Sequence, residues 1–266
     1  MLRNRLLVAS VLLSLTVYAL NDGGLFFFFL VAALILLSGY EFFELVRHAG
    51  YQPLTPVGLV LIAIFLLQAY AKADWTRDLL IITIMLTLVL AVFRSGEGWL
   101  VGWALTMVGV LYVGGLGSYF ILMRGLPDGK IFGTMAAFST FAMDTAAYTV
   151  GKRWGKHSFF PRVSPKKTWE GAVGGWVFAL IAMLIMGWLF EQTNPHMNVV
   201  HSLALGVGIA LIGTFGDLAE SVIKRQVNAK DSSAMLGAHG GILDRLDSLL
   251  FVAPFVYYYV IWVLGM

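Results

Sequence analysis

Apolar residues run in long stretches along the whole chain, and short polar segments separate them. A helix of roughly 20 apolar residues is long enough to cross the hydrocarbon core of a bilayer. The pattern predicts nine such segments, several of them short for a full crossing: residues 6–20, 25–40, 57–71, 79–93, 99–123, 131–150, 171–190, 201–217 and 249–265. We therefore expect an all-α, polytopic integral membrane protein with about nine transmembrane helices.

Composition supports a membrane protein. The chain is 59% hydrophobic and 12% charged, whereas soluble domains carry roughly a quarter charged residues. The apolar runs leave no room for a sizeable soluble domain. We expect one continuous membrane domain, with a scaffold in residues 1–130 and a catalytic region in residues 131–266. The first apolar stretch lacks a small-residue cleavage site, so we interpret it as a span and not as a signal peptide.

The distribution of basic residues predicts the orientation in the membrane. Lys and Arg accumulate on the cytoplasmic side of membrane proteins. With the N-terminus inside, fourteen of the 18 Lys and Arg residues fall on the inner side. We therefore expect a protein of the cell membrane whose charge-rich stretches, 151–170 and 218–248, face the cytoplasm.

In the N-terminal half, charged residues sit at the ends of apolar segments or in short loops, whereas from Asp144 onward acids and bases enter or border the segments themselves. Asp217, Glu220 and Lys224 have the spacing of one helix face. A carboxylate at the edge of hydrocarbon is costly unless it is paired or binds a cation. A water-facing ion pair between Glu220 and Lys224 is the simpler alternative. Asp144 lies within an apolar segment and is a functional candidate by position, although a buried hydrogen bond to Tyr148 would also explain it.

The stretch 239–248, HGGILDRLDS, leads into the last apolar segment. Gly240 and Gly241 permit a sharp turn or a close approach to a ligand. A helix that begins here presents free N–H groups, which favour anions such as phosphate. Asp244 and Asp247 would repel each other on one helix face unless a cation lies nearby, but both are also suited to capping the helix.

The absence of cysteine and the position of two glutamates bear on which metal and which site the protein could have. The chain has no cysteine, so a metal would be held by carboxylates, His or backbone oxygens, which favours a hard ion such as Mg²⁺. Glu41 and Glu44 stand at the end of an apolar segment near Arg47. A surface ion pair is the simpler interpretation of these acids, with contact to an active-site cavity as the alternative.

The segment 221–247 resembles the signature of the phosphatidate cytidylyltransferase family, also called CDP-diacylglycerol synthases, which reads approximately S-x-x-K-R-x4-K-D-x5-P-G-H-G-G-x-x-D-R-x-D. The matching residues are Ser221, Lys224, Arg225, Lys230, Asp231, His239, Gly240, Gly241, Asp244, Arg245 and Asp247. Gly237 and Ala238 stand where the family usually has Pro and Gly, which we expect to change the rigidity of the loop.

A second block, 144–175, resembles another part of the same family. The matching residues are Asp144, Ala147, Tyr148, Gly151, Gly155, Lys156, Ser164, Pro165, Lys167, Thr168, Glu170 and Gly171. From the residues alone, Ser164-Pro165 suggests a turn, and the neighbouring Lys and Arg side chains could gather a triphosphate. Ordinary accumulation of positive charge on the inner side is the alternative.

The resemblance implies transfer of a cytidylyl group from CTP to phosphatidate, giving CDP-diacylglycerol and pyrophosphate. We expect Mg²⁺ to be held by Asp217 and Asp244, with a second cation near Asp144 or Asp247. Lys224, Arg225 and Arg245 would hold the lipid phosphate or the pyrophosphate, and His239 would bind phosphate or, as the alternative, protonate a leaving oxygen. The other candidate substrate-binding residues are Ser164, Lys167, Thr168, Glu170, Ser221, Lys230, Asp231, Gly240 and Gly241.

Both substrates must reach one site, so we expect a polar cavity in the C-terminal spans that opens to the cytoplasm and to the bilayer. The resemblance makes a homodimer plausible, and we expect no nucleic-acid partner. A cytidylyltransferase for an ether-lipid phosphate and a cation- or proton-coupled transporter are the alternatives. The transporter leaves the basic SPKKTWEG stretch (164–171) unexplained.

Overall fold

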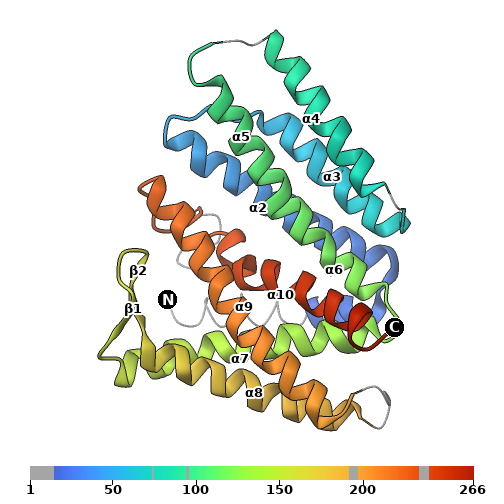
Figure 1. Cartoon of the computed structure of the whole chain (residues 1–266), viewed down its shortest axis with the longest axis vertical. Coiled ribbons are helices and arrows are strands. Elements are labelled where there is room, and N and C mark those ends of the chain that lie inside the picture. Colours follow the sequence, from blue (N-terminus) through green and yellow to red (C-terminus); the bar gives the residue numbers. More distant parts are fainter. Residues whose placement is uncertain (1–14, 74, 94–95, 192–196, 234–239) are drawn as a thin grey trace. The chain divides into compact units, whose positions relative to one another are not determined.

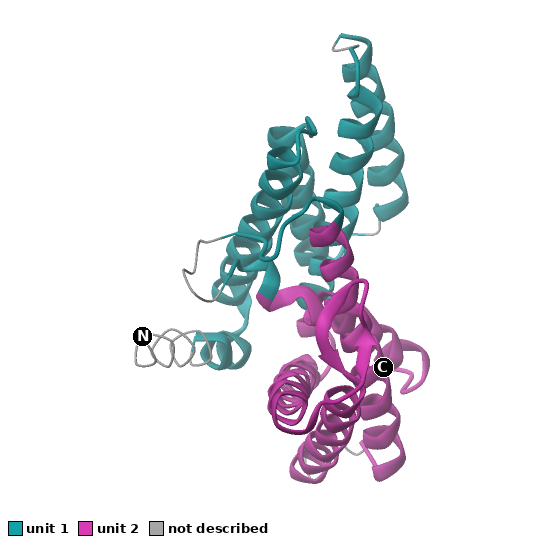
Figure 2. Ribbon diagram, turned by 90° about the vertical axis from the view of Figure 1, so that its left-hand side faces the viewer, with its two compact units in different colours: residues 1–122, 226–244 teal, residues 123–225, 245–266 magenta. Residues whose placement is uncertain are grey.

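The computed structural model describes residues 15–73, 75–93, 96–191, 197–233 and 240–266. Within them the chain is a set of helices joined by short loops, with one small β-hairpin (Figure 1). The chain divides into two compact units, coloured separately in Figure 2. Unit 1 contains residues 1–122 and 226–244, and unit 2 contains residues 123–225 and 245–266.

Unit 1 is built mainly from helices in the first half of the chain. A π-helical turn interrupts the apolar stretch 99–124, so that α5, η1 and α6 follow one another without a loop. The elements are α2 (Gly24–His48), α3 (Thr55–Ala71), α4 (Thr76–Val92), α5 (Trp99–Gly109), η1 (Val110–Gly115) and the beginning of α6 (Leu116–Arg124).

Aromatic side chains of α2 form the core of unit 1. Phe42 and Phe43 are almost completely buried. Glycines let the neighbouring helices approach these rings, since a Cβ at Gly58 of α3 or Gly109 of α5 would overlap the Phe43 ring. This close packing fixes the C-terminal half of α2, which carries Glu41.

Unit 2 contains the longer helices of the C-terminal half and the hairpin. A proline, Pro254, lies inside the last helix. The elements are α7 (Gly129–Trp154), β1 (Ser158–Phe160), β2 (Ser164–Thr168), α8 (Trp169–Phe190), α9 (Val199–Gln226) and α10 (Leu243–Trp262). Helix α9 extends by its last residue into unit 1, and α10 begins in unit 1 with Leu243 and Asp244.

The structure agrees with the all-α class and adds one small β-hairpin that the sequence did not predict. Its two strands pair antiparallel, with Ser158 opposite Thr168 and Phe160 opposite Ser164. The expected turn at Ser164-Pro165 is wrong, because both residues belong to β2 and the turn occupies residues 161–163. The connection between α7 and α8 is therefore a pair of hydrogen-bonded strands and not an irregular exposed loop.

Small residues hold α7 and α8 together. A Cβ added at Gly175 would stand 2.9 Å from the Met143 carbonyl oxygen and 3.0 Å from the Ala147 Cβ. On the other side of α8, the Trp176 Nε1–H donates to the Thr214 hydroxyl of α9 over 3.0 Å. Helix α8 is therefore fixed between α7 and α9.

The helices agree with the apolar pattern. Each predicted segment from 25–40 onward lies in a helical stretch, and most of 6–20 lies outside the described residues. Among the residues that the structure describes, four stretches are long and apolar enough to cross a membrane: 24–48, 99–124, 169–190 and 199–226. The chain is thus an α-helical membrane protein, while the number of nine spans stays a prediction.

The contact between α7 and α8 generates a test of this packing. Replacing Gly175 by Ala places a methyl group against the backbone of α7, and we expect it to lower the free energy of unfolding by about 1–3 kcal/mol. The eight Trp residues allow thermal unfolding in detergent to be followed by intrinsic fluorescence.

Gly115→Ala is the matched control, because the nearest atom to a Cβ there is 4.0 Å away. We expect its melting temperature to be unchanged or higher, since Ala favours helix over Gly by roughly 0.5–1 kcal/mol. Equal melting temperatures for Gly175→Ala and the wild-type protein would contradict the proposed tight crossing.

Candidate active site

Three of the predicted aspartates come together in unit 2. Asp144 of α7, Asp217 of α9 and Asp247 of α10 are near enough to repel one another electrostatically. Two positive charges lie near Asp144, those of Lys167 and Arg245. The cluster therefore joins residues from both sequence blocks that resemble the family.

An ion pair links the hairpin to this cluster. The Lys167 Nζ of β2 lies 2.5 Å from the Asp217 Oδ2, and both side chains are about one-third exposed or less. The hairpin is anchored by Phe159, which packs in a buried cluster with Ala172 of α8 and Leu218 of α9. Docking of the hairpin on α8 and α9 therefore brings Lys167 to the acid.

The other two aspartates differ in their surroundings. Asp247 is buried and accepts a hydrogen bond from the Ser248 backbone N–H over 2.6 Å. Asp144 is exposed in the isolated molecule. The alternative of a buried Asp144–Tyr148 hydrogen bond is wrong, because Tyr148 is 69% exposed and its ring lies 5.7 Å from the Lys152 Nζ.

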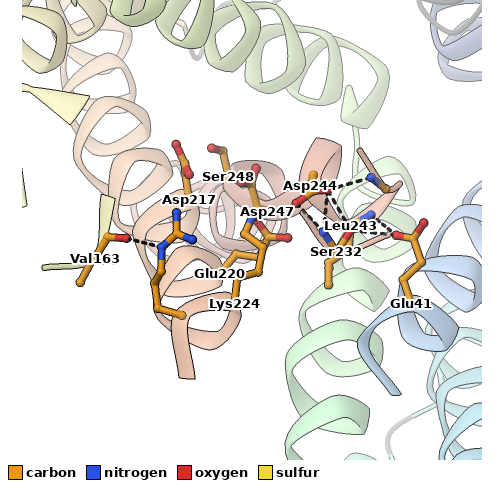
Figure 3. A network of polar contacts seen from close by, with 12 residues as sticks. Glu41, Val163, Asp217, Glu220, Lys224, Ser232, Leu243, Asp244, Asp247 and Ser248 are labelled. Carbon is orange, nitrogen blue, oxygen red and sulfur yellow. Dashed lines mark hydrogen bonds and ion pairs between the residues drawn. The ribbon is translucent and has the colours of Figure 1, made fainter. Parts of the chain in front are cut away.

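The end of α9 carries two more of the predicted cations. Lys224 pairs with Glu220 at 2.5 Å, as the spacing predicted, but the Glu220 side chain is only 1% exposed. The pair therefore faces the protein interior and not water. The Arg225 Nε–H donates to the Val163 carbonyl of the hairpin turn over 3.1 Å (Figure 3). Ser221, on the same helix, is buried.

The beginning of α8 is held by residues that the sequence marked as substrate-binding. Thr168 caps the helix by accepting a hydrogen bond from the Gly171 N–H over 3.2 Å. Glu170 accepts hydrogen bonds from the backbone N–H groups of Lys156 and His157 and pairs with the His157 ring at 2.6 Å. These contacts order the basic stretch that follows α7.

Glycines of the second block have a packing role at this junction. A Cβ at Gly155 would stand 2.6 Å from the Thr168 hydroxyl oxygen, and one at Gly151 would stand 3.1 Å from it. These two glycines thus allow α7 to approach the hairpin closely. Their spacing differs from that of the glycines in a phosphate-binding P-loop. Ser164, in strand β2, is half-buried.

Asp244 belongs to a separate polar network in unit 1. Its carboxylate accepts hydrogen bonds from the Gly241 N–H at 2.7 Å and from the backbone N–H and hydroxyl of Ser232 at 2.9 and 3.0 Å. Gly240 adopts a φ of 77°, a conformation that favours glycine. Asp244 therefore accepts backbone hydrogen bonds at the start of α10, in line with its predicted capping role.

Glu41 is the residue that the sequence interpretation missed. It is 1% exposed and accepts hydrogen bonds from Ser233 and the backbone N–H of Ile242. It also accepts from Ser232 and from the backbone N–H of Leu243, both of which are drawn in Figure 3. The predicted surface pair is therefore wrong for this residue. The sequence did contain a signal for this burial. Glu41 stands at the end of an apolar run, and no basic residue lies one helical turn away from it.

The prediction of an ion pair is confirmed for Glu44, whose Oε2 lies 2.7 Å from the Arg47 guanidinium. Glu41 and Glu44 both line a cavity of about 550 Å³ in unit 1. Ser232, Ser233 and Asp231 line its other side. Lys230 and Asp231 are largely exposed, with a separation of 4.0 Å between their charged atoms.

The described residues contain no group of three or more His, Asp or Glu side chains arranged to hold a metal ion. His239 lies outside the described residues. Asp217 and Asp244 belong to different units, and their joint binding of Mg²⁺ stays a prediction. Within unit 2, the grouped carboxylates offer the oxygen ligands that a hard cation prefers.

Comparison with known proteins agrees with the sequence resemblance. The model of a family described as the cytidylyltransferase family matches residues 3–263. A phosphatidate cytidylyltransferase of Synechocystis is 29% identical, with 98% of this chain and 97% of the relative covered. The enzyme of that name from Bacillus subtilis is 34% identical over 76% of each chain.

A phosphatidate cytidylyltransferase of Brucella suis is 32% identical and covers 96% of this chain and 92% of its own length. The matched region includes both described units and both blocks of polar residues. The chain therefore belongs to the cytidylyltransferase family.

Proposed function

We propose that the protein transfers the cytidylyl group of CTP to phosphatidate, forming CDP-diacylglycerol and pyrophosphate. The names of the relatives support both substrates. The observation that carries the proposal is the Lys167–Asp217 pair within the aspartate cluster of unit 2. It joins a cation suited to a triphosphate with acids suited to a divalent cation, and Lys167, Asp144 and Asp247 come from the blocks that resemble the family.

The reaction needs positioning more than a strong base. A phosphomonoester has a second pKa of about 6, so the phosphatidate phosphate is largely a dianion at neutral pH. One of its oxygens forms a bond to the α-phosphorus of CTP, and the bond from that phosphorus to the β-phosphate oxygen breaks. Pyrophosphate leaves with the bonding electrons, and no proton needs to be removed from the attacking oxygen.

The chain's own cations would bring these two anions together. Lys167, which pairs with Asp217, would be available to a phosphate of CTP if a cation were bound at the acid. Arg245 lies near the same acids, where it can neutralise phosphate charge. The guanidinium of Arg225 bonds to the hairpin turn, so its role would include holding the hairpin in position for CTP.

We propose that Mg²⁺ is the cofactor, with Asp217 and Asp244 as its predicted ligands. The mutual repulsion of Asp144, Asp217 and Asp247 is a cost that a cation bound nearby would remove. When bound, the ion would supply charge neutralisation for the phosphates. A second cation in the same cluster, a cytoplasm-facing site and a homodimer belong to the same proposal.

The first prediction of the proposed function concerns the transfer reaction itself. Purified protein with labelled CTP, phosphatidate and Mg²⁺ is expected to give a chloroform-extractable labelled lipid and pyrophosphate, and omission of any one component should abolish the product. An ether-lipid phosphate tested in parallel separates the two cytidylyltransferase hypotheses. Absence of product with all lipids, from protein that melts cooperatively, would overturn the proposal in favour of cation transport.

The second prediction concerns Asp217. We expect Asp217→Asn to lower kcat by at least about 100-fold, because the amide removes the charge that would hold the cation. It should also weaken Mn²⁺ binding, measured by electron paramagnetic resonance without substrate. Asp22→Asn, at an exposed acid, serves as the control and should behave like wild type. Normal Mn²⁺ affinity in Asp217→Asn would remove this residue from the cation site.

The third prediction concerns Lys167, whose ammonium competes with a cation for Asp217. Lys167→Gln should lower the Mg²⁺ concentration needed for half-maximal activity and raise the KM for CTP by about tenfold or more. Lys167→Arg should retain more of the CTP affinity because it keeps the positive charge. A higher Mg²⁺ requirement in Lys167→Gln would contradict the competition.

A further inference from the structure

The carboxylate of Glu41 is the most prominent polar group of unit 1 to which the proposed function assigns no role. Its two oxygens have different partners. The Oε1 accepts from the Ser233 hydroxyl at 2.5 Å and the Ile242 N–H at 3.0 Å. The Oε2 accepts from the Leu243 N–H at 2.8 Å and the Ser232 hydroxyl at 3.3 Å. The carboxylate therefore connects α2 to a part of the chain some 200 residues away.

A buried carboxylate of this kind needs compensation. Burial of an unpaired charge is costly, and Glu41 is 1% exposed. The compensation comes from four hydrogen bonds and from the positive end of α10, whose first N–H groups lack partners within the helix. In turn, Glu41 fixes where α10 begins.

Glu41 also connects to Asp244 through a shared serine. The Ser232 hydroxyl lies 3.0 Å from the Asp244 Oδ2 as well as 3.3 Å from the Glu41 Oε2. One hydroxyl proton serves two carboxylates, so the position of each acid depends on the other. Figure 3 shows Glu41, Ser232 and Asp244 joined in this order.

The network leaves no room for a side chain at position 241. A Cβ at Gly241 would overlap the Ser232 hydroxyl oxygen and stand 2.5 Å from the Glu41 Oε2. A residue with a side chain at position 241 would therefore displace the acid or the serine. The glycine at this position, which the sequence interpretation assigned to substrate, is required by Glu41.

We infer that Glu41 is a positioning residue for the cytidylyl transfer, acting through Ser232 and the start of α10 on Asp244. The inference rests on the proposed function and on the prediction that Asp244 is a ligand of its Mg²⁺. It assigns Glu41 no contact with substrate. Supporting groups that orient a reacting residue affect rate strongly, because a displacement of about 1 Å can cost on the order of 100-fold.

The test begins with Glu41→Gln, which keeps the shape of the side chain. In either orientation, the amide nitrogen would face a hydroxyl and a backbone N–H that both donate to the carboxylate. We expect kcat to fall about 10–100-fold with the KM for CTP changed by less than about twofold. Glu41→Asp keeps the charge and should recover part of kcat.

Hydrogen exchange measured by mass spectrometry provides a readout independent of activity. In Glu41→Gln, the amides of Ile242 and Leu243 should exchange faster, by about tenfold or more for the one that faces the amide nitrogen, since that amide loses its hydrogen bond and the other keeps only a neutral acceptor. Ser232→Ala cuts the link to Asp244 and spares the two amides. It should therefore lower kcat without changing their exchange.

Glu44→Gln is the matched control, one turn later on α2 and paired with Arg47 at the surface. It should keep both wild-type kcat and wild-type exchange. Full kcat in Glu41→Gln, or an equal loss of kcat in Glu44→Gln, would overturn the inference. If Glu41→Gln fails to fold, normal kcat in Ser232→Ala overturns it. A wild-type protein without product would refute the proposed function while the exchange result still tests the network.

Discussion

Compensation of carboxylates in apolar surroundings is the constraint on which the polar structure of this protein depends. An acid removed from water needs a cation, a set of N–H donors or both. The chain uses both solutions. In unit 2, Asp217 is paired with Lys167 and Glu220 with Lys224. In unit 1, Glu41 and Asp244 are satisfied by backbone N–H groups and serine hydroxyls.

The two solutions suit different tasks. An ion pair such as Lys167–Asp217 can be exchanged for a substrate phosphate and a metal cation, since each partner keeps a charge of the right sign. A carboxylate bound by fixed N–H groups has no such freedom, and it makes the local backbone rigid. We therefore associate the cluster of unit 2 with chemistry and the Glu41 network of unit 1 with positioning.

Close packing of backbones makes these contacts possible. The hairpin can carry Lys167 to Asp217 because Phe159 anchors it on α8 and α9, while Gly151 and Gly155 admit Thr168. The Glu41 network likewise depends on the absence of a side chain at Gly241. Several glycines of the signature blocks thus act through the space that they leave free for other residues.

The sequence by itself determined the membrane class, the positions of the helices and the family. Apolar runs are local, and the signature residues have fixed spacing. It also identified the Glu220–Lys224 and Glu44–Arg47 pairs, because neighbours on one helix face follow from helical periodicity.

Only the tertiary structure decided which distant groups meet. The hairpin at 158–168 depends on pairing across a turn and on anchoring by Phe159, which the spacing of basic residues does not encode. The partners of Glu41 lie some 200 residues away, so a local interpretation assigned it to the surface. Burial and long-range hydrogen bonding are properties of the folded chain, and they gave Glu41 and Gly241 their roles.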